Sequence, residues 1–149
     1  MARHAGAVSL LVLVLAGCLN SNTLSQSVHL VNGTLSPLPP DKVALVRVTE
    51  GAAASTVLAQ ERETGWPDED IAWRDGGCVL IAWFQPEPMS FNPDPGSPYP
   101  VYLVRLVDLT ATGRATWVMV NAETGELGAA LSGQFPFECA TLRERIGIA

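Results

Sequence analysis

Few residues of this chain can transfer protons. It holds two histidines: His4 lies close to the N-terminus, and His29 lies in a stretch rich in Asn, Ser and Thr. Hydrolases built on a Ser-His-Asp or Cys-His arrangement need a well-placed histidine as general base. The sequence also has no G-x-S-x-G motif, no S-x-x-K motif and no phosphate-binding glycine loop. We therefore expect a protein that is not an enzyme and that holds no cofactor and no histidine-ligated metal.

Carboxylates are the remaining side chains that could bind a metal ion or take part in catalysis. Asp68, Glu69 and Asp70 are consecutive and can offer oxygen ligands to Ca²⁺, although their spacing does not match an EF-hand loop. Adjacent acids in a turn usually face water, so metal binding is the weaker interpretation. A glycosidase with two carboxylates needs a cleft that a small sheet hardly provides.

The N-terminus combines a basic residue, an apolar run and small residues before a cysteine, in the order MARHAGAVSLLVLVLAGC. This order is typical of a secretory signal peptide. The apolar run, from Ala5 to Ala16, is shorter than the span of about 20 residues that crosses a membrane. We expect residues 1–17 to be a signal peptide that is removed on export.

The last residues of this segment, Leu15-Ala16-Gly17-Cys18, resemble the lipobox of bacterial lipoproteins. The resemblance implies that the Cys18 thiol receives a diacylglycerol, that cleavage occurs before Cys18, and that its new amino group is acylated. The acyl chains would then hold the protein on the periplasmic or extracellular side of the cell membrane or outer membrane. An ordinary signal peptide with an incidental cysteine is the alternative.

Export would leave Cys78 and Cys139 as a pair in an oxidising compartment, which favours a disulfide. The bond would close a loop of 61 residues (139 − 78 = 61). The chain-entropy model gives about 4 kcal/mol for a loop of this length. Two buried free thiols are the alternative. A metal or redox site is disfavoured because the chain has no CxxC pair and no histidine nearby.

The chain length of 149 residues leaves room for one core. Residues 18–40 are rich in Asn, Ser, Thr and Pro, which is typical of a lipidated tether, and we place the domain at 41–149. Asp41 stands where a helix N-cap belongs, before an alanine-rich stretch. We predict one helix over about 40–62, loosened at Gly51, while a strand over 43–49 is the alternative.

Runs of β-branched and aromatic residues predict two hairpins. The first joins 71–74 to 78–84 through a glycine turn, and the second pairs 101–108 with 115–121. The proline-rich segment 85–100 between them is expected to be an exposed loop. After the second hairpin, Asn121 can accept bonds from the backbone and Gly125 can take a positive φ. Residues 128–149 form a tail that the disulfide would draw across the sheet.

Three tryptophans fall on the predicted strands, at Trp73, Trp83 and Trp117. Packing in the core is one interpretation of their position. The other is an apolar sheet face that a partner covers, because residues 101–107 are apolar on both faces and one helix cannot bury both. These three tryptophans are therefore the candidate binding face.

Residues 121–127, Asn-Ala-Glu-Thr-Gly-Glu-Leu after a strand with Val118 and Val120, resemble the closing strand of PepSY-like modules of exported bacterial proteins. Asn121 stands where that family usually has Asp. The resemblance implies an α+β fold in which one N-terminal helix packs on a small antiparallel sheet of about four strands. It also implies a role in binding partners in the cell envelope, and it transfers no catalytic residue.

The formal net charge of −6 disfavours nucleic acid as a partner, because the surface repels phosphates. The sequence thus predicts a membrane-anchored, non-catalytic envelope module. It would bind a protein or peptide through its apolar sheet face or by adding a strand at a sheet edge. The alternative is a binder of a small apolar ligand or lipid between helix and sheet.

Overall fold

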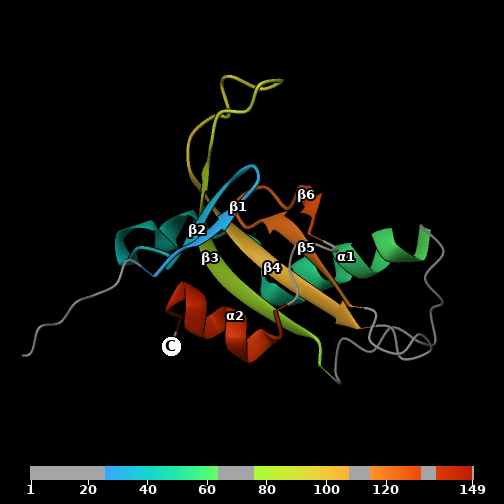
Figure 1. Ribbon diagram of the computed structural model, residues 1–149. Helices are drawn as coiled ribbons and strands as arrows, with labels where there is room; N and C mark the ends of the chain where they lie inside the picture. Colours follow the sequence, from blue (N-terminus) through green and yellow to red (C-terminus); the bar gives the residue numbers. More distant parts are fainter. Residues whose placement is uncertain (1–25, 64–75, 108–114, 132–136, 149) are drawn as a thin grey trace, which may run out of the picture.

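The computed structural model describes residues 26–63, 76–107, 115–131 and 137–148. Within these residues six strands form one antiparallel sheet, in which each strand pairs with its neighbour in sequence. The strands are β1 (Val28–Leu30), β2 (Gly33–Ser36), β3 (Cys78–Pro86), β4 (Tyr99–Val107), β5 (Ala115–Asn121) and β6 (Leu127–Ala130). The sheet curls into a half-barrel (Figure 1).

The centre of the sheet is β4. It pairs with β3 from Phe84↔Tyr99 to Cys78↔Arg105, and with β5 from Val101↔Asn121 to Val107↔Ala115. Because both of its edges are bonded and its residues are mainly Val, Leu and Tyr, β4 is buried on both faces. The strands predicted over 101–108 and 115–121 are confirmed as far as the chain is described.

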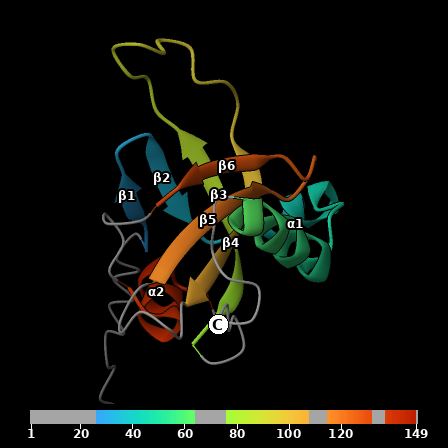
Figure 2. The same ribbon diagram turned by 90° about the vertical axis from the view of Figure 1, so that its right-hand side faces the viewer.

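Two helices cover the two faces of the sheet (Figure 2). The helix α1 (Glu50–Glu63) packs on the convex face, and α2 (Cys139–Ile146) packs on the concave face. The alternation of β4 sends Tyr102 and Val104 toward α1, and it sends Leu103 toward α2. No helix among the described residues has the length and apolarity needed to cross a membrane.

The predicted fold class, one N-terminal helix packed on about four strands, is wrong. The sheet has six strands, and the second helix, α2, occupies the face that the prediction left open. Residues 28–36 were expected to lie in the tether, but they form β1 and β2. The reason is that Val28 and Leu35 are cross-strand partners that point into the concave core, a pattern that the Asn-, Ser- and Thr-rich composition obscured.

The single helix predicted over 40–62 is also wrong. A 3₁₀-helix, η1 (Pro40–Leu45), is separated from α1 by an extended connection. The N–H groups of Arg47 and Val48 both donate to the carbonyl oxygen of Ala122 at 2.9 Å. These tertiary hydrogen bonds hold the connection out of a helical conformation. The N-terminus of α1 is capped by Thr49, whose hydroxyl accepts the Ala52 N–H at 3.2 Å.

The first predicted hairpin, the proline-rich loop, the tail and the turn after β5 can each be compared with the structure. Residues 71–74, the first strand of the first predicted hairpin, lie outside the described residues, and β3 pairs with β2 and β4. The proline-rich loop is shorter than predicted, since β3 continues to Pro86 and β4 begins at Tyr99. The tail contains β6 and α2.

The turn after β5 is confirmed. Asn121 Oδ1 accepts the N–H groups of Glu123 and Thr124, and Gly125 has a φ of 81°.

At Gly33 the backbones of β2 and β3 leave no room for a side chain. A Cβ atom on Gly33 would overlap the Gln85 carbonyl oxygen and lie 2.6 Å from the Phe84 ring. We expect Gly33→Ala to lower the free energy of unfolding by about 2 kcal/mol, because paired backbone has to move. The matched control is Gly51→Ala in α1, where nothing lies within 4 Å and helix propensity improves. Urea unfolding of both variants tests this. Equal free energies of unfolding for Gly33→Ala and Gly51→Ala would contradict the close packing of β2 on β3 at Gly33.

Candidate functional site

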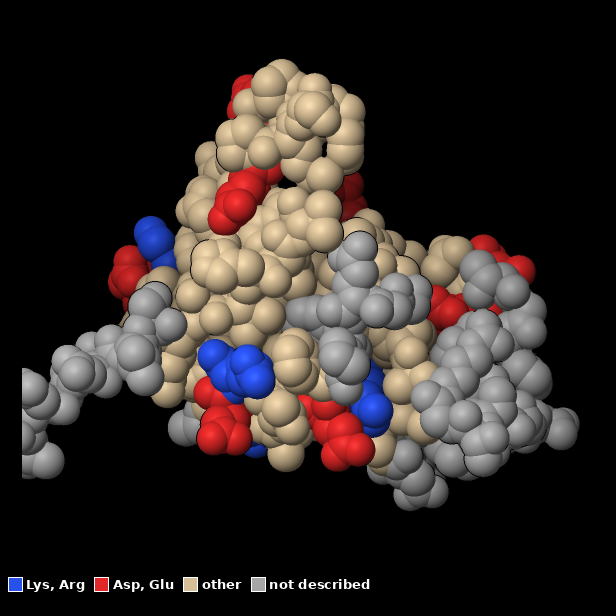
Figure 3. All heavy atoms as spheres, in the orientation of Figure 1, with Lys and Arg blue, Asp and Glu red and all other residues tan. Residues whose placement is uncertain are grey.

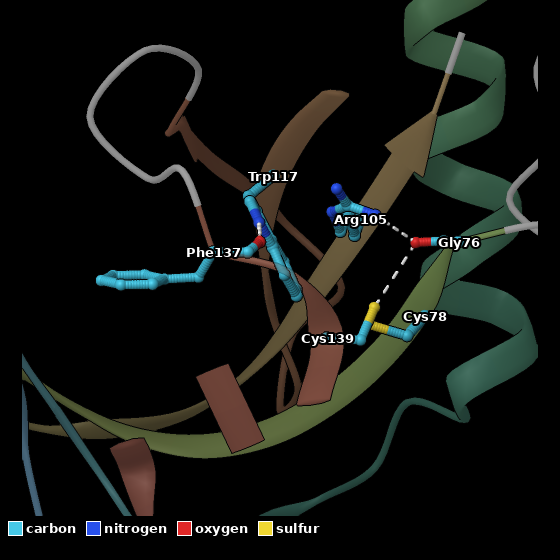
Figure 4. The surroundings of a disulfide bond; sticks show 6 residues. All are labelled: Gly76, Cys78, Arg105, Trp117, Phe137 and Cys139. Atoms are coloured by element: carbon cyan, nitrogen blue, oxygen red, sulfur yellow. Dashed lines mark hydrogen bonds between the residues drawn. A yellow bond between two sulfur atoms is a disulfide. The ribbon is translucent and has the colours of Figure 1, made fainter. Parts of the chain in front are cut away.

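The predicted disulfide between Cys78 and Cys139 is present (Figure 4). It joins the first residue of β3 to the first residue of α2, with a Cα–Cα distance of 6.2 Å. Beside it, Trp117 Nε1 donates to the Phe137 carbonyl oxygen at 2.9 Å. The disulfide and the hydrogen bond from Trp117 therefore help to hold the N-terminal end of α2 on the concave face.

Trp83 and Trp117, two of the three tryptophans proposed as a binding face, do not share a surface. Trp117 belongs to the concave core and is only 1% exposed. Trp83 is half-buried and alternates with Val79 and Ile81 toward the α1 face. β4 also separates their two strands, and Trp73 lies outside the described residues. Trp117 is thus a core residue, as the core-packing interpretation of the tryptophans predicts.

The open part of the concave face lies around Tyr99, at the end of β4 opposite the disulfide. Two hollows flank this residue, and together they form what we call the Tyr99 site. The first has a volume of about 90 Å³ and is lined by Tyr99, Val101, Met119, Asn121, Glu126, Leu127 and Gly128. The second has a volume of about 160 Å³ and is lined by Asn32, Phe84, Pro86, Glu87, Met89, Asn92, Pro95 and Tyr99.

The proline-rich loop, residues 87–98, stands out beyond the sheet next to the second hollow, and we call it the arm (Figure 1). Met89 and Asn92 exchange two backbone hydrogen bonds of 2.9 Å, which close its turn. Phe91 lies in this turn and is 79% exposed. The space-filling view shows the arm as a mostly uncharged knob (Figure 3).

Hydrogen bonds to the β1–β2 hairpin fix the base of the arm. The Glu87 N–H donates to the Asn32 carbonyl oxygen at 3.0 Å, and the Thr34 hydroxyl donates to Glu87 Oε1 at 2.7 Å. His29 Nδ1 lies 3.0 Å from the same hydroxyl oxygen. His29 therefore belongs to β1 and helps brace the arm through Thr34.

The charges around the Tyr99 site are negative. Residues 115–131 contain two acids, Glu123 and Glu126, and no Lys or Arg, while the arm contains Glu87 and Asp94 and no Lys or Arg. Burial raises the pKa of Tyr99, and the nearby Glu126 carboxylate raises it further. The arrangement suits a bound group that is cationic or donates hydrogen bonds.

Metal binding was a weaker expectation for Asp68, Glu69 and Asp70, which all lie outside the described residues. In the part of the chain that is described, His, Cys, Asp and Glu form no group of three or more that could hold a metal ion. Comparison with known proteins gives no relative: no family model matches the chain, and neither curated proteins nor solved structures yielded a match.

The sequence interpretation missed the Tyr99 site. Tyr99 and Glu126 are 27 residues apart (126 − 99 = 27), and the pairing of β4 with β5 together with the turn at 121–126 brings them close. One signal was available: Tyr99 follows a loop of alternating prolines and opens a strand, so its ring had to lie at a sheet end.

The chain has two tyrosines, so Tyr102→Phe leaves Tyr99 as the single titrating phenol. We expect this phenol to titrate above its ordinary pKa of 10.0. Adding Glu126→Gln should lower the pKa without restoring the ordinary value, because burial is the larger cause. Since the folded state favours the protonated phenol, its contribution to stability is complete below pH 10.0 and is lost as the pH rises further. Tyrosinate absorbance measures this, and an unchanged titration in Glu126→Gln would contradict the placement of that carboxylate.

Removal of the disulfide should loosen α2. We expect the double variant Cys78→Ser, Cys139→Ser to lose about 4 kcal/mol of unfolding free energy, because the open chain regains the entropy of a loop with a sequence separation of 61. Reduction of the wild-type protein should give the same loss, and reduction of the double variant should give none. Urea unfolding with and without reductant measures both, and a loss below about 1 kcal/mol would contradict the entropic role.

Proposed function

We propose that this protein is an exported bacterial lipoprotein, anchored through acyl groups on Cys18, whose domain is a non-catalytic binding module of the cell envelope. The observation that carries the proposal is the Cys78–Cys139 disulfide, which holds α2 on the concave face. Disulfides with a structural role persist in oxidising compartments and are rare in the cytosol. Export is also what the signal-like segment and the lipobox-like residues 15–18 suggest.

The binding role is supported by the Tyr99 site and the arm. A braced arm with Phe91 exposed at its turn, beside the second hollow, offers a surface that is already organised for a partner. The Thr34 hydroxyl donates to Glu87 Oε1 at 2.7 Å and lies 3.0 Å from His29 Nδ1, and these contacts join the arm to the β1–β2 hairpin. The geometry therefore favours recognition of a partner.

The alternative of a small apolar ligand or lipid is less well supported by the volumes. Sites for such ligands usually measure about 300–1,000 Å³. The two hollows measure about 90 and 160 Å³, and the space between the sheet and each helix is filled by core side chains. A hollow of this size accepts one side chain of a partner, and we therefore favour a protein or peptide.

The anchor is tested by expressing the full-length chain in a bacterium and analysing its N-terminal peptide by mass spectrometry. We expect an N-terminus at Cys18 that carries diacylglycerol and an acyl group, and a protein that partitions into detergent. Cys18→Ala should lose the acyl groups, while Cys78→Ser and Cys139→Ser together should retain them. An intact, unacylated Met1 on wild-type protein would refute the proposal.

A further inference from the structure

Among the residues that the structure describes, no strand pairs with the outer edge of the sheet at β6. β6 is the last strand in the sheet order, and all four of its residues are exposed. Proteins usually protect such edges with Lys, Pro or a covering segment, because unpaired N–H and C=O groups attract other strands. β6 reads Leu-Gly-Ala-Ala and carries neither a charge nor a proline. The register of β6 is irregular between its pairs with Val118 and Val120, so the positions open to another strand are those of the two regular pairs, Leu127 and Ala130.

The register of β6 shows which of its backbone groups are free to pair. The Asn121 N–H donates to the Glu126 carbonyl at 2.8 Å, and the Leu131 N–H donates to the Trp117 carbonyl at 2.7 Å. Leu127 and Ala130 lie next to these bonded positions, as partners of Val120 and Val118. Because bonded and outward-facing residues alternate in an antiparallel ladder, Leu127 and Ala130 direct their N–H and C=O groups away from β5.

The first hollow of the Tyr99 site opens beside this edge. Gly128 forms part of its lining and has no side chain that would close it, and a Cβ atom there would stand 3.2 Å from Met119 Cβ. Tyr99 and Glu126 both line the hollow, and the Glu126 carboxylate is close enough to the Tyr99 phenol to raise its pKa. Apart from one contact of 3.3 Å with the Thr124 hydroxyl, no hydrogen bond to this carboxylate is found among the described residues. A partner side chain that crosses Gly128 would enter a hollow of about 90 Å³ whose lining includes Glu126.

We propose that the edge of β6 and the first hollow together bind an extended segment of a partner protein, whose backbone pairs with β6 and whose Lys or Arg side chain enters the hollow. This mode is strand addition, in which the backbone supplies affinity and a pocket beside the strand supplies specificity. Charge complementarity identifies the basic side chain, since residues 115–131 carry two acids and no basic residue. The inference rests on the proposed binding function and names its ligand.

A second copy of this chain is a poorer occupant than a basic segment. Pairing β6 with β6 of another copy would satisfy the backbone, but Leu127–Ala130 has no basic side chain to place in the hollow.

The test uses the full-length protein in detergent and a short fluorescent peptide of alternating threonine and valine with one central lysine. A twin peptide carries norleucine in place of lysine. We expect the lysine peptide to bind about tenfold more tightly, because its ammonium group forms a charge-assisted hydrogen bond with Glu126. Glu126→Gln should remove this preference, whereas Glu123→Gln, in the same turn and outside the lining of the hollow, should keep it.

The backbone contribution is tested by Ala130→Pro, which removes one outward N–H and leaves the Leu131–Trp117 bond to β5 intact. We expect this variant to bind the lysine peptide about tenfold more weakly or not at all. Ala130→Ser keeps the N–H and should bind like wild type. Equal unfolding temperatures of the two variants show that the fold is retained. Hydrogen exchange should slow at the Leu127 and Ala130 amides when the peptide binds.

Two results of the peptide-binding measurements would overturn the inference. One is equal binding of the lysine and norleucine peptides, or no binding of either. The other is wild-type affinity in an Ala130→Pro variant that is folded. Dimerisation through β6 in the absence of peptide, seen by analytical ultracentrifugation and abolished by Ala130→Pro, would assign the edge to a second copy. In each case an acylated Cys18 leaves the proposed lipoprotein function standing, so the two proposals fail separately.

Discussion

The constraint on which this structure depends is that β4 is apolar on both faces. A strand of this kind is stable only in a layered arrangement that excludes water from both sides of the sheet. The convex side is covered by α1, through Ala53 and Val57. The concave side is covered by α2, which has only eight residues and buries Leu142 and Ile146. An isolated helix of this length is not stable in water, so its position depends on packing and on the disulfide.

The shortness of α2 also explains why a site is available. α2 begins at Cys139, which the disulfide fixes beside the start of β3, and its eight residues cover one end of the concave face. At the opposite end of β4, the rings of Phe84 and Tyr99 meet edge to face, with 5.5 Å between their centroids. This aromatic pair closes the core there, and the two hollows lie at its margin. The extent of the helix thus divides the face into a core half and an open half.

Local chemistry accounts for the features that could be predicted from the sequence. The two central strands follow from β-branched runs, the turn after β5 follows from Asn121 and Gly125, and the disulfide follows from the cysteine count. The wrong predictions concern segments whose backbone conformation is determined by tertiary contacts. Val48 has the propensity to continue a helix or a strand, and hydrogen bonds with Ala122 and Tyr102 determine its conformation. The Tyr99 site could not be predicted because its residues come from several strands and the arm.

The position of β6 is also determined by contacts with residues distant in the sequence. Its register on β5 is irregular between Val118 and Val120, so β6 is held by fewer regular pairs than the inner strands. Its position instead follows from the turn at 121–126, where the Ala122 carbonyl accepts the bonds of the connection before α1 and the Ala122 N–H donates to Pro100. β6 is therefore placed by the core through a rigid turn, although its own side chains contribute little burial. An edge fixed in this way keeps its backbone groups in a defined geometry for pairing, which lowers the entropy that a binding partner has to overcome.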